Sequence, residues 1–500
     1  MNDVVASLGL GLAVAATASN LWYCFLGALI GTLIGVLPGI GPIATMAMLL
    51  PLTYYLPPTA ALIMLAGIYY GAQYGGSTTA ILMRLPGESS SVVTCLDGYA
   101  MAQRGRAGAA LATAALASFF AGTVSTLLIA FASPPLTAMA QRFGPAEYFA
   151  LMTLGLIAAV VFTQGPPLRA VAMIFLGLLF GFVGADVETG RDRFTFGLPE
   201  LRDGIGVVVV SMGLFGIAEV MLNLAGGAAQ RGERAKLSRL WLTRADLAAA
   251  WPATLRGTAI GALLGVLPGG GAMLGSFASY AVEKRISATP HRFGEGAIEG
   301  VAGPEAANNA GAQASFIPML ALGIPSNSVM AMMVGAMMIH GIAPSPNLAI
   351  ARPELFWGLI ASMWIGNLML LVINLPLVGV WVRLLDVPYR VLFPAILLFC
   401  CIGIYTVNSS ATEIVLVAAF GVLGLVFTRL DCPLAPFVLA FILGPLMEEN
   451  LRRAMLLSRG DPTVFLTRPI SLALLVCCAA AVALLLLPSF RRVRATAGAG

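Results

Sequence analysis

The feature that most restricts this chain is a run of 80 residues, 4–83, without a single Asp, Glu, Lys or Arg. At about 1.5 Å per helical residue, the run is long enough to cross a ~30 Å hydrocarbon core about three or four times. Charged residues make up 10% of the chain and hydrophobic residues 59%. Because a soluble surface needs roughly 25% charged residues, the composition excludes a soluble globular protein and predicts a polytopic membrane protein.

Further uncharged runs recur along the chain, and the longest cover residues 107–141, 306–351 and 355–382. Counting one helix for each ~20 residues, and allowing for broken helices, we expect about 12 transmembrane spans. The alternation of apolar and polar residues over ~10-residue segments, typical of an outer-membrane barrel, is missing. The predicted fold class is therefore an all-α polytopic membrane protein.

The chain contains a duplicated pattern. Residues 27–42 read GALIGTLIGVLPGIGP and residues 257–272 read GTAIGALLGVLPGGGA, with 10 of the 16 positions identical. The segments YYGAQ and LPGESSSV follow the first copy, and NNAGAQ and IPSNSV follow the second copy in the same order. Three matches in the same order indicate internal duplication.

The basic loops fall at opposite ends of the two copies. In the first copy Arg104 and Arg106 follow the third matching segment, whereas in the second copy Lys284 and Arg285 follow the first. Since basic loops face the cytoplasm, this placement predicts two inverted repeats. The expected organisation is a first membrane repeat (1–225), a cytoplasmic linker (226–250), a second membrane repeat (251–490) and a basic cytoplasmic tail (491–500).

The two GVLPG segments predict broken helices. A proline followed by several glycines does not continue a regular helix, and irregular backbone within a membrane is tolerated where it is buried in protein or lines a cavity. The alternative is a kink that serves packing alone, as we expect for the GxxxG ladders just upstream. Because the breaks are duplicated, we predict that they contribute to a substrate or ion site, with Gly39, Gly41, Gly269 and Gly271 as its candidate residues.

The LPGESSS and IPSNSV segments predict the tips of two re-entrant hairpins. Each places a proline and a group of small polar residues between two apolar helices. Helix starts at such tips present free N–H groups that bind carboxylates, and the nearby oxygens suit Na⁺. The alternative is that these residues only cap the next helix. We expect both tips to meet near the bilayer midplane, with Gly87, Ser89, Ser90, Ser91, Ser326, Asn327 and Ser328 as candidate substrate or ion ligands.

Isolated polar residues supply the remaining candidates. Glu88 lies in the first tip, where it could pair with Arg84, coordinate a cation, bind a proton or simply lie at the membrane surface. A polar cluster formed by Asn308, Asn309 and Gln313 is expected to face a cavity, and Tyr69, Tyr70 and Gln73 are the matching positions in the first repeat. The acidic residues Glu295, Glu299 and Glu305 are interpreted as interfacial.

Several kinds of chemistry have no support in the sequence. There is no Walker motif, HExxH, GxSxG or paired His/Cys cluster, so we expect neither an enzyme nor a directly ATP-driven pump. The seven cysteines form no CxxC pair and are interpreted as small apolar side chains, so no transition metal and no cofactor is expected. The basic residues are spread over short loops, which argues against nucleic-acid binding. A carboxylate or anion channel, or an uncoupled facilitator, stays an alternative, although polarity concentrated in paired tips favours a transporter.

The motifs GVLPGIGP, YYGAQYGGSTTAILMRLPGESSSVV, GVLPGGGA and NNAGAQASFIPMLALGIPSNSV resemble the large permease subunit of tripartite tricarboxylate transporters, the TctA family. The resemblance covers nearly the whole chain. It implies a multi-pass protein of the bacterial inner membrane that imports di- or tricarboxylates such as citrate, coupled to Na⁺ or H⁺. It also implies two partners, a small TctB-like membrane subunit and a periplasmic TctC-like solute-binding protein.

Overall fold

The computed structural model describes residues 2–37, 41–163, 166–186, 189–225, 240–267, 271–345, 347–384, 394, 397–398, 400–402, 404–405 and 410–486. Gly39 and Gly269 lie outside these residues, as do the prolines before them, most of the predicted linker and the basic tail. The described remainder of that linker is residues 240–250, of which residues 244–250 form the first turns of a helix.

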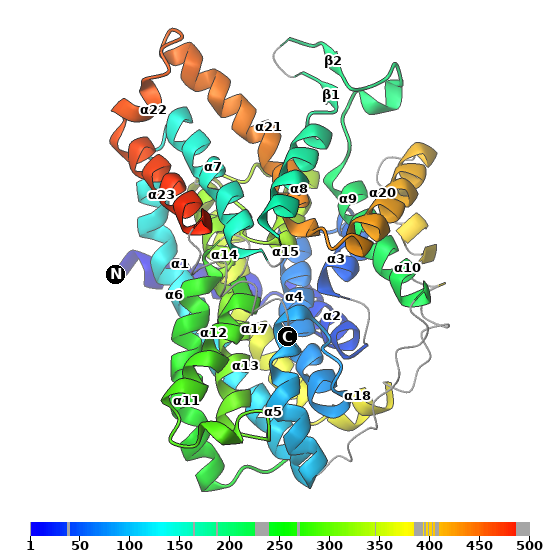
Figure 1. Ribbon diagram of the computed structural model, residues 1–500, viewed down its shortest axis with the longest axis vertical. Helices are drawn as coiled ribbons and strands as arrows, with labels where there is room; N and C mark the ends of the chain where they lie inside the picture. Colours follow the sequence, from blue (N-terminus) through cyan, green and yellow to red (C-terminus); the bar gives the residue numbers. More distant parts are fainter. Residues whose placement is uncertain are drawn as a thin grey trace.

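The described chain is almost entirely helical (Figure 1). Its first half contains α1 (Asn2–Ala15), α2 (Ala18–Val36), α3 (Pro42–Thr53), α4 (Pro58–Met83), the 3₁₀ turn η1 (Ser89–Val92), α5 (Thr94–Met101), the π-helical turn η2 (Ala102–Arg106), α6 (Ala107–Ala140), α7 (Pro145–Phe162), α8 (Pro167–Gly181), the 3₁₀ turn η3 (Pro199–Leu201), α9 (Val207–Ser211), the π-helical turn η4 (Met212–Ile217) and α10 (Ala218–Ala225). A short antiparallel hairpin of β1 (Gly184–Ala185) and β2 (Asp192–Arg193) follows α8.

The second half is likewise helical. It contains α11 (Arg244–Gly265), α12 (Gly271–Ile286), the 3₁₀ turn η5 (Pro290–Arg292), α13 (Glu299–Ala314), α14 (Phe316–Leu322), α15 (Ser328–Ile339), α16 (Leu348–Ala351), α17 (Pro353–Asn374), α18 (Val378–Leu384), α20 (Ala411–Arg429), α21 (Leu434–Leu457), α22 (Val464–Thr467) and α23 (Pro469–Leu486).

Within the described residues, 6 helical segments are long and apolar enough to cross a membrane: 18–36, 94–140, 145–162, 353–374, 411–429 and 434–457. Several further apolar helices, such as α3 and α15, are 10–17 residues long. Large apolar side chains are exposed on α17, α20 and α23, including Val372, Val415 and Val476. These features support the predicted α-helical membrane protein, whereas the expected number of spans and the inverted arrangement stay predictions.

The glycine ladders pack two helix pairs closely, as the sequence predicts. A Cβ atom on Gly31 of α2 would lie 2.4 Å from the carbonyl oxygen of Ile68 on α4. A Cβ atom on Gly261 of α11 would lie 2.2 Å from the carbonyl oxygen of Ala307 on α13. Only glycine permits these approaches, so the same kind of contact joins equivalent helices in both halves.

The two predicted tips share an unusual backbone. Arg84, directly after α4, and Gly323, directly after α14, both adopt the left-handed conformation, with φ of 57° and 74°. Four residues later, Glu88 (φ −152°, ψ 166°) and Asn327 (φ −152°, ψ 175°) are the N-caps of the next helical segments. Both pairs are 239 positions apart in the sequence. Matching conformations at matching positions support the predicted duplication.

The helix after the first tip is bound to the second half by a buried carboxylate. Asp97 of α5 has no exposed surface, and its Oδ1 accepts hydrogen bonds from the backbone N–H groups of Gly294, Gly296 and Ala297 at 2.9, 2.7 and 2.7 Å. Its Oδ2 accepts a hydrogen bond of 2.9 Å from the Tyr280 hydroxyl on α12. Asp97 therefore fixes α5 against α12 and the loop that leads into α13.

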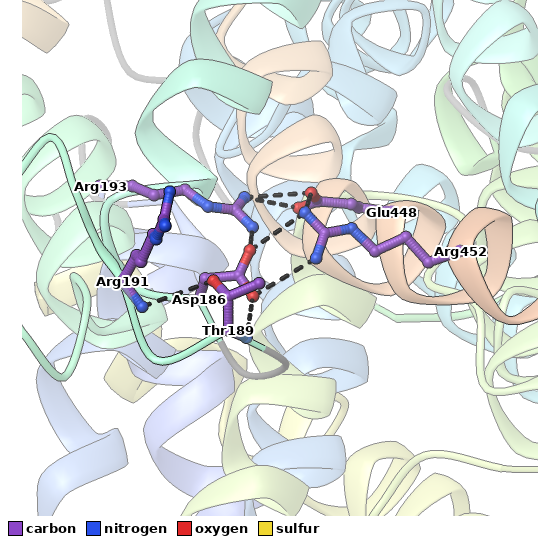
Figure 2. Close-up of polar contacts among 6 residues, drawn as sticks. All are labelled: Asp186, Thr189, Arg191, Arg193, Glu448 and Arg452. Carbon is purple, nitrogen blue, oxygen red and sulfur yellow. Dashed lines mark hydrogen bonds and ion pairs between the residues drawn. The ribbon is translucent and has the colours of Figure 1, made fainter.

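Opposite ends of the molecule carry different charged clusters (Figure 1). At the end formed by α5 and the start of α11, Arg106 pairs with Asp246, and Arg104 pairs with Glu295 at 3.2 Å. At the other end the β1–β2 hairpin lies against α21. Figure 2 shows the network there, which alternates acidic and basic side chains from the hairpin and α21: Asp186, Arg193, Glu448 and Arg452.

Candidate functional site

A cavity of about 680 Å³ lies where the helix breaks and the hairpin tips of both halves meet. Its lining includes the starts of α3 and α12, the two tips, and two side chains of α4. These residues are Gly41, Pro42, Ile43, Tyr69, Gln73, Pro86, Gly87, Glu88, Ser89, Ser90, Gly271, Ala272, Met273, Leu274, Asn327, Ser328 and Val329. The rest of the lining comes from other elements: Phe162, Thr163, Phe215, Glu219, Pro433, Leu434 and Ala435.

The cavity brings together many of the residues that the sequence singles out. From both helix breaks and both tips it collects Gly41, Gly87, Glu88, Ser89, Ser90, Gly271, Asn327 and Ser328. Ser91, Ser326, Asn308, Asn309 and Gln313 lie behind this lining rather than in it. Tyr69 and Gln73 also reach the cavity, whereas Tyr70 packs against Gly366 of α17.

Glu88 is held by uncharged donors. Its Oε1 accepts hydrogen bonds from the Ser90 hydroxyl at 2.6 Å and from Nδ2 of Asn308 at 3.2 Å. The Ser90 oxygen also lies 3.2 Å from Oε1 of Gln73, so its single proton serves one of these two acceptors at a time. In the described part of the chain no ion pair joins Glu88 to Arg84, whose side chain is exposed. Of the roles left open by the sequence, the pairing with Arg84 is not observed, and a cation site, a proton site and a position at the membrane surface stay predictions.

The second tip combines a helix cap with groups that face the cavity. Oδ1 of Asn327 accepts a hydrogen bond of 2.9 Å from the backbone N–H of Met330, which caps α15. Nδ2 of Asn327 lies toward α12, 3.7 Å from the position of a Cβ atom on Gly271. Ser326 is buried and donates to the carbonyl oxygen of Ser315 at 3.2 Å. Capping by Asn327 is therefore observed, and it leaves the amide N–H groups near the cavity.

The polar residues of α13 point in different directions. Nδ2 of Asn309 donates to the Ser118 hydroxyl oxygen at 2.6 Å and to the Glu305 carbonyl oxygen at 3.1 Å, so Asn309 joins α13 to α6. Asn308 approaches the cavity through Glu88. Oδ1 of Asn308 and Oε1 of Gln313 are buried oxygens without a hydrogen-bond partner. Unsatisfied buried acceptors are costly, and those of Asn308 and Gln313 are available to a donor or a cation.

Glu305, which the sequence groups with the interfacial acidic residues, is buried within the protein. It has no exposed surface, and its Oε2 accepts a hydrogen bond of 2.6 Å from the Ser77 hydroxyl on α4. Its Oε1 accepts a hydrogen bond from the Thr94 hydroxyl on α5. Since α13 begins at Glu299, Glu305 lies nearly two turns into this helix and inside the bundle, while its position relative to the membrane surface stays a prediction.

Sequence reasoning missed Glu219 at the cavity. The backbone N–H of Gly41, the N-cap of α3, donates to Oε1 and Oε2 of Glu219 at 3.2 and 3.3 Å. The available signal was an isolated acidic residue directly after the uncharged run 204–218. An acidic residue inside an apolar segment marks a functional position in membrane proteins.

The sequence reasoning also missed two further hairpins that reach the cavity. One turns between α7 and α8 at Thr163, and the other turns between α20 and α21 at Pro433. The sequence signal for each hairpin was a proline that interrupts an apolar run and is preceded by a threonine. In the structure these threonine hydroxyls donate to their own helices, Thr163 to the Ala159 carbonyl oxygen at 2.5 Å and Thr428 to the Gly424 carbonyl oxygen at 2.8 Å.

The cavity combines apolar walls with a smaller set of polar groups. Among the residues that the structure describes, its lining includes no Lys, Arg or His. Its polar groups are the carboxylates of Glu88 and Glu219, the amides of Gln73 and Asn327, hydroxyl groups such as Ser89 and Ser328, and backbone N–H groups at helix starts. Such a set can bind carboxylates through neutral donors and cations through oxygens.

The chain is similar to two proteins from Agrobacterium vitis. A protein from Agrobacterium vitis named "Uncharacterized 52.8 kDa protein in TAR-I ttuC' 3'region" is 55% identical over 494 residues, which are 99% of this chain and 98% of the relative. A second, named "Uncharacterized protein in TAR-II ttuC' 3'region" from the same organism, is 58% identical over 234 residues, 47% of this chain and 97% of the relative. No solved structure matches the chain. The profile of the tripartite tricarboxylate transporter TctA family matches residues 21–439, so the chain belongs to the TctA family.

Proposed function

We propose that this chain is the large membrane subunit of a tripartite secondary transporter that imports di- or tricarboxylates with Na⁺ or H⁺. The observation that carries this proposal is the cavity of about 680 Å³, in which helix starts and polar tips from both halves converge. Convergence of duplicated broken elements on one site is typical of secondary transporters. Membership of a transporter family supports the same function.

The cavity recognises carboxylates without a basic side chain. The starts of α12 and α15 reach it at Gly271 and Ser328, and a helix N-terminus stabilises an anion through its free N–H groups and dipole. The Asn327 amide and the Ser89 and Ser328 hydroxyl groups supply further neutral donors. Several separated donors suit a substrate with two or three carboxylates better than one with a single charge.

Cation coupling follows from the charges in the cavity. Two unit charges ~6 Å apart repel by about 3 kcal/mol at an effective dielectric constant of ~20. A dianion that enters beside Glu88 and Glu219 meets this repulsion more than once. Bound Na⁺ or H⁺ removes it, so substrate and cation bind together. Sodium at the tips would use carboxylate, amide and hydroxyl oxygens, the ligands that hard cations prefer.

The proposed setting is the bacterial inner membrane, with two inverted repeats and about 12 spans. The end with Arg104, Arg106 and the linker faces the cytoplasm, since basic loops remain on that side. The end with the β1–β2 hairpin then faces the periplasm, where a TctC-like binding protein delivers substrate (Figure 1). A TctB-like small subunit completes the membrane part, as the family name implies.

Uptake into proteoliposomes tests this function. Both membrane subunits are reconstituted, with or without the binding protein, and a panel of radiolabelled di- and tricarboxylates is offered under an imposed Na⁺ or H⁺ gradient. We expect accumulation of at least one carboxylate that needs the gradient and the binding protein. Downhill flux that is independent of any cation gradient would instead support a channel or uncoupled facilitator.

A further inference from the structure

Glu219 occupies a position at which a substrate carboxylate could bind. The residue lies on α10, and both of its carboxylate oxygens are within hydrogen-bond distance of the Gly41 N–H, 178 positions away in the sequence. In the described part of the chain this N–H is the recorded partner of the Glu219 carboxylate. The start of α3 is therefore already filled by a carboxylate that belongs to the protein.

The equivalent helix start in the second half shows that the fold does not need such a carboxylate. Gly271 of α12 corresponds to Gly41 in the duplicated motif. Near Gly271 lies Nδ2 of Asn327, 3.7 Å from the position of its Cβ atom, and both residues line the cavity. One of the two matching helix starts thus faces a carboxylate and the other faces an amide, which points to a specific role for Glu219.

Glu219 is also the less satisfied of the two acidic side chains in the cavity. Glu88 accepts hydrogen bonds from the Ser90 hydroxyl and the Asn308 amide, whereas Glu219 has one backbone donor shared by its two oxygens. A carboxylate offers about four acceptor sites. Among the described lining residues there is no Lys, Arg or His, so no basic side chain of the lining fills the remaining acceptor sites of Glu219, and a cation can bind there.

We propose that Glu219 is a tethered carboxylate that blocks the start of α3 until a monovalent cation neutralises it. Binding of Na⁺ or a proton weakens the hydrogen bond from Gly41, and the freed N–H then donates a hydrogen bond to a carboxylate of the substrate. One cation therefore binds at Glu219 before the substrate is fully bound. The inference rests on the proposed carboxylate transport and adds a named coupling site outside the hairpin tips.

Other titratable or charged side chains that lie near Glu219 act on it electrostatically. The titratable groups that line the same cavity are Tyr69 and Glu88. The helix packed against α10 is α20, whose charged residues, Glu413 and Arg429, lie in its first and last turns. η4 and α3, which pack beside this contact, carry no Asp, Glu, Lys, Arg or His. Glu88 is thus the nearest competitor for a cation within the cavity lining.

The experiment compares wild type with Glu219→Gln, in which the amide oxygen still accepts the Gly41 N–H but carries no charge. Purified complex in nanodiscs is titrated with ²²Na⁺ at fixed pH, and separately with protons in choline buffer. Binding of the carboxylate that is accumulated fastest by wild type is then measured at low and high cation concentration. Glu200→Gln, at an exposed position in η3, is the matched control.

We expect the cation to raise wild-type and Glu200→Gln affinity for the carboxylate at least tenfold. In Glu219→Gln this dependence should fall below threefold, and one bound cation per protein should be lost, in the Na⁺ arm or in the proton arm. A Glu219→Gln variant with the cation dependence of wild type would overturn the inference. A wild-type complex that transports no carboxylate at all would instead overturn the proposed function, so the two failures are distinguishable.

A second variant tests the proposal if Glu219→Gln does not assemble. Glu219→Asp keeps the charge but shortens the side chain by one methylene, so its carboxylate reaches Gly41 less well. In this variant the cation concentration that gives the half-maximal effect should shift at least threefold, while carboxylate affinity still depends on the cation. An unchanged midpoint in Glu219→Asp would contradict the proposed contact.

Discussion

The Asp97 carboxylate offers the most direct test of how the first tip is held. Asp97→Ala removes the acceptor of three backbone N–H groups, on Gly294, Gly296 and Ala297, and of the Tyr280 hydroxyl. The site is fully buried, so water does not replace the lost oxygen without rearrangement. Gly300 also packs on the carboxylate, since a Cβ atom there would lie 2.3 Å from Oδ2 of Asp97.

The expected destabilisation is large. Leaving one buried donor without a partner costs about 1–3 kcal/mol, so three orphaned N–H groups amount to about 3–9 kcal/mol. Asp97→Asn keeps one acceptor oxygen and loses the charge assistance, so it should cost less, about 1.5–3 kcal/mol. The order of stability should therefore be wild type, then Asp97→Asn, then Asp97→Ala.

Thermal unfolding of the detergent-solubilised protein, followed by size-exclusion chromatography after heating, measures this order. Asp203→Ala, in an exposed loop, is the control. Asp97 lies on α5 and holds it to the second half, as Glu305 does through Thr94, so the Asp97→Asn variant should also raise the apparent substrate constant by loosening the first tip. If Asp97→Ala unfolds at the same temperature as wild type and Asp203→Ala, the proposed network does not join the two halves energetically.

Three further predictions concern packing, the tips and the hairpin. Gly31→Leu and Gly261→Leu should abolish the yield of folded protein on a membrane-fraction blot, because a Cβ atom would lie 2.4 and 2.2 Å from a facing carbonyl oxygen. The control Gly9→Leu, whose Cβ atom would have nothing within 4 Å, should give a normal yield. Ser90→Ala and Asn327→Ala should each raise the apparent substrate or Na⁺ constant about ten- to hundredfold in uptake assays, the equivalent of about 1.5–3 kcal/mol. If both variants give the same constants as the control Ser458→Ala, the tips serve only as helix caps. Arg193→Ala should expose the β1–β2 hairpin to limited proteolysis, because it removes the ion pairs of Arg193 with Asp186 and with Glu448 of α21 (Figure 2). Arg202→Ala, which removes an exposed ion pair, should not have this effect, and equal cleavage in both variants would show that the network does not anchor the hairpin.

Local chemistry explains the parts of the fold that the sequence predicts well. The glycine ladders and the tips depend on residue types whose conformational effects act within a few positions, such as the prolines and glycines of LPGESSS and IPSNSV. Duplication then adds long-range information, because equivalent segments of two repeats converge in space. Together these signals predicted that Gly41, Gly87, Ser89, Gly271 and Ser328 share one site, and these residues do line one cavity.

The residues that sequence reasoning misplaced depend on helix rotation and depth, which no local pattern specifies. Asn308 and Asn309 are neighbours, yet one donates to Glu88 and the other to Ser118 on α6. Glu305 and Glu219 are acidic residues whose partners lie far away in the sequence. Hydropathy has a similar limit, because almost every residue of α4 from Ala60 to Met83 is buried in protein rather than exposed to lipid.

The two halves have diverged, and they contribute different charges to the cavity. Glu88 and Asn327 occupy the same backbone position of the two tips, but one is a carboxylate and the other an amide. Gly41 and Gly271 begin equivalent helices, but Glu219 covers the first and Asn327 lies near the second. Both negative charges therefore lie beside elements of the first half, and neutral donors prevail beside the second. On the proposed function, cations bind at the acidic side chains beside the first half, and carboxylates bind at helix starts and neutral donors of both halves. Each bound cation therefore lowers the electrostatic cost of the anion in the same cavity.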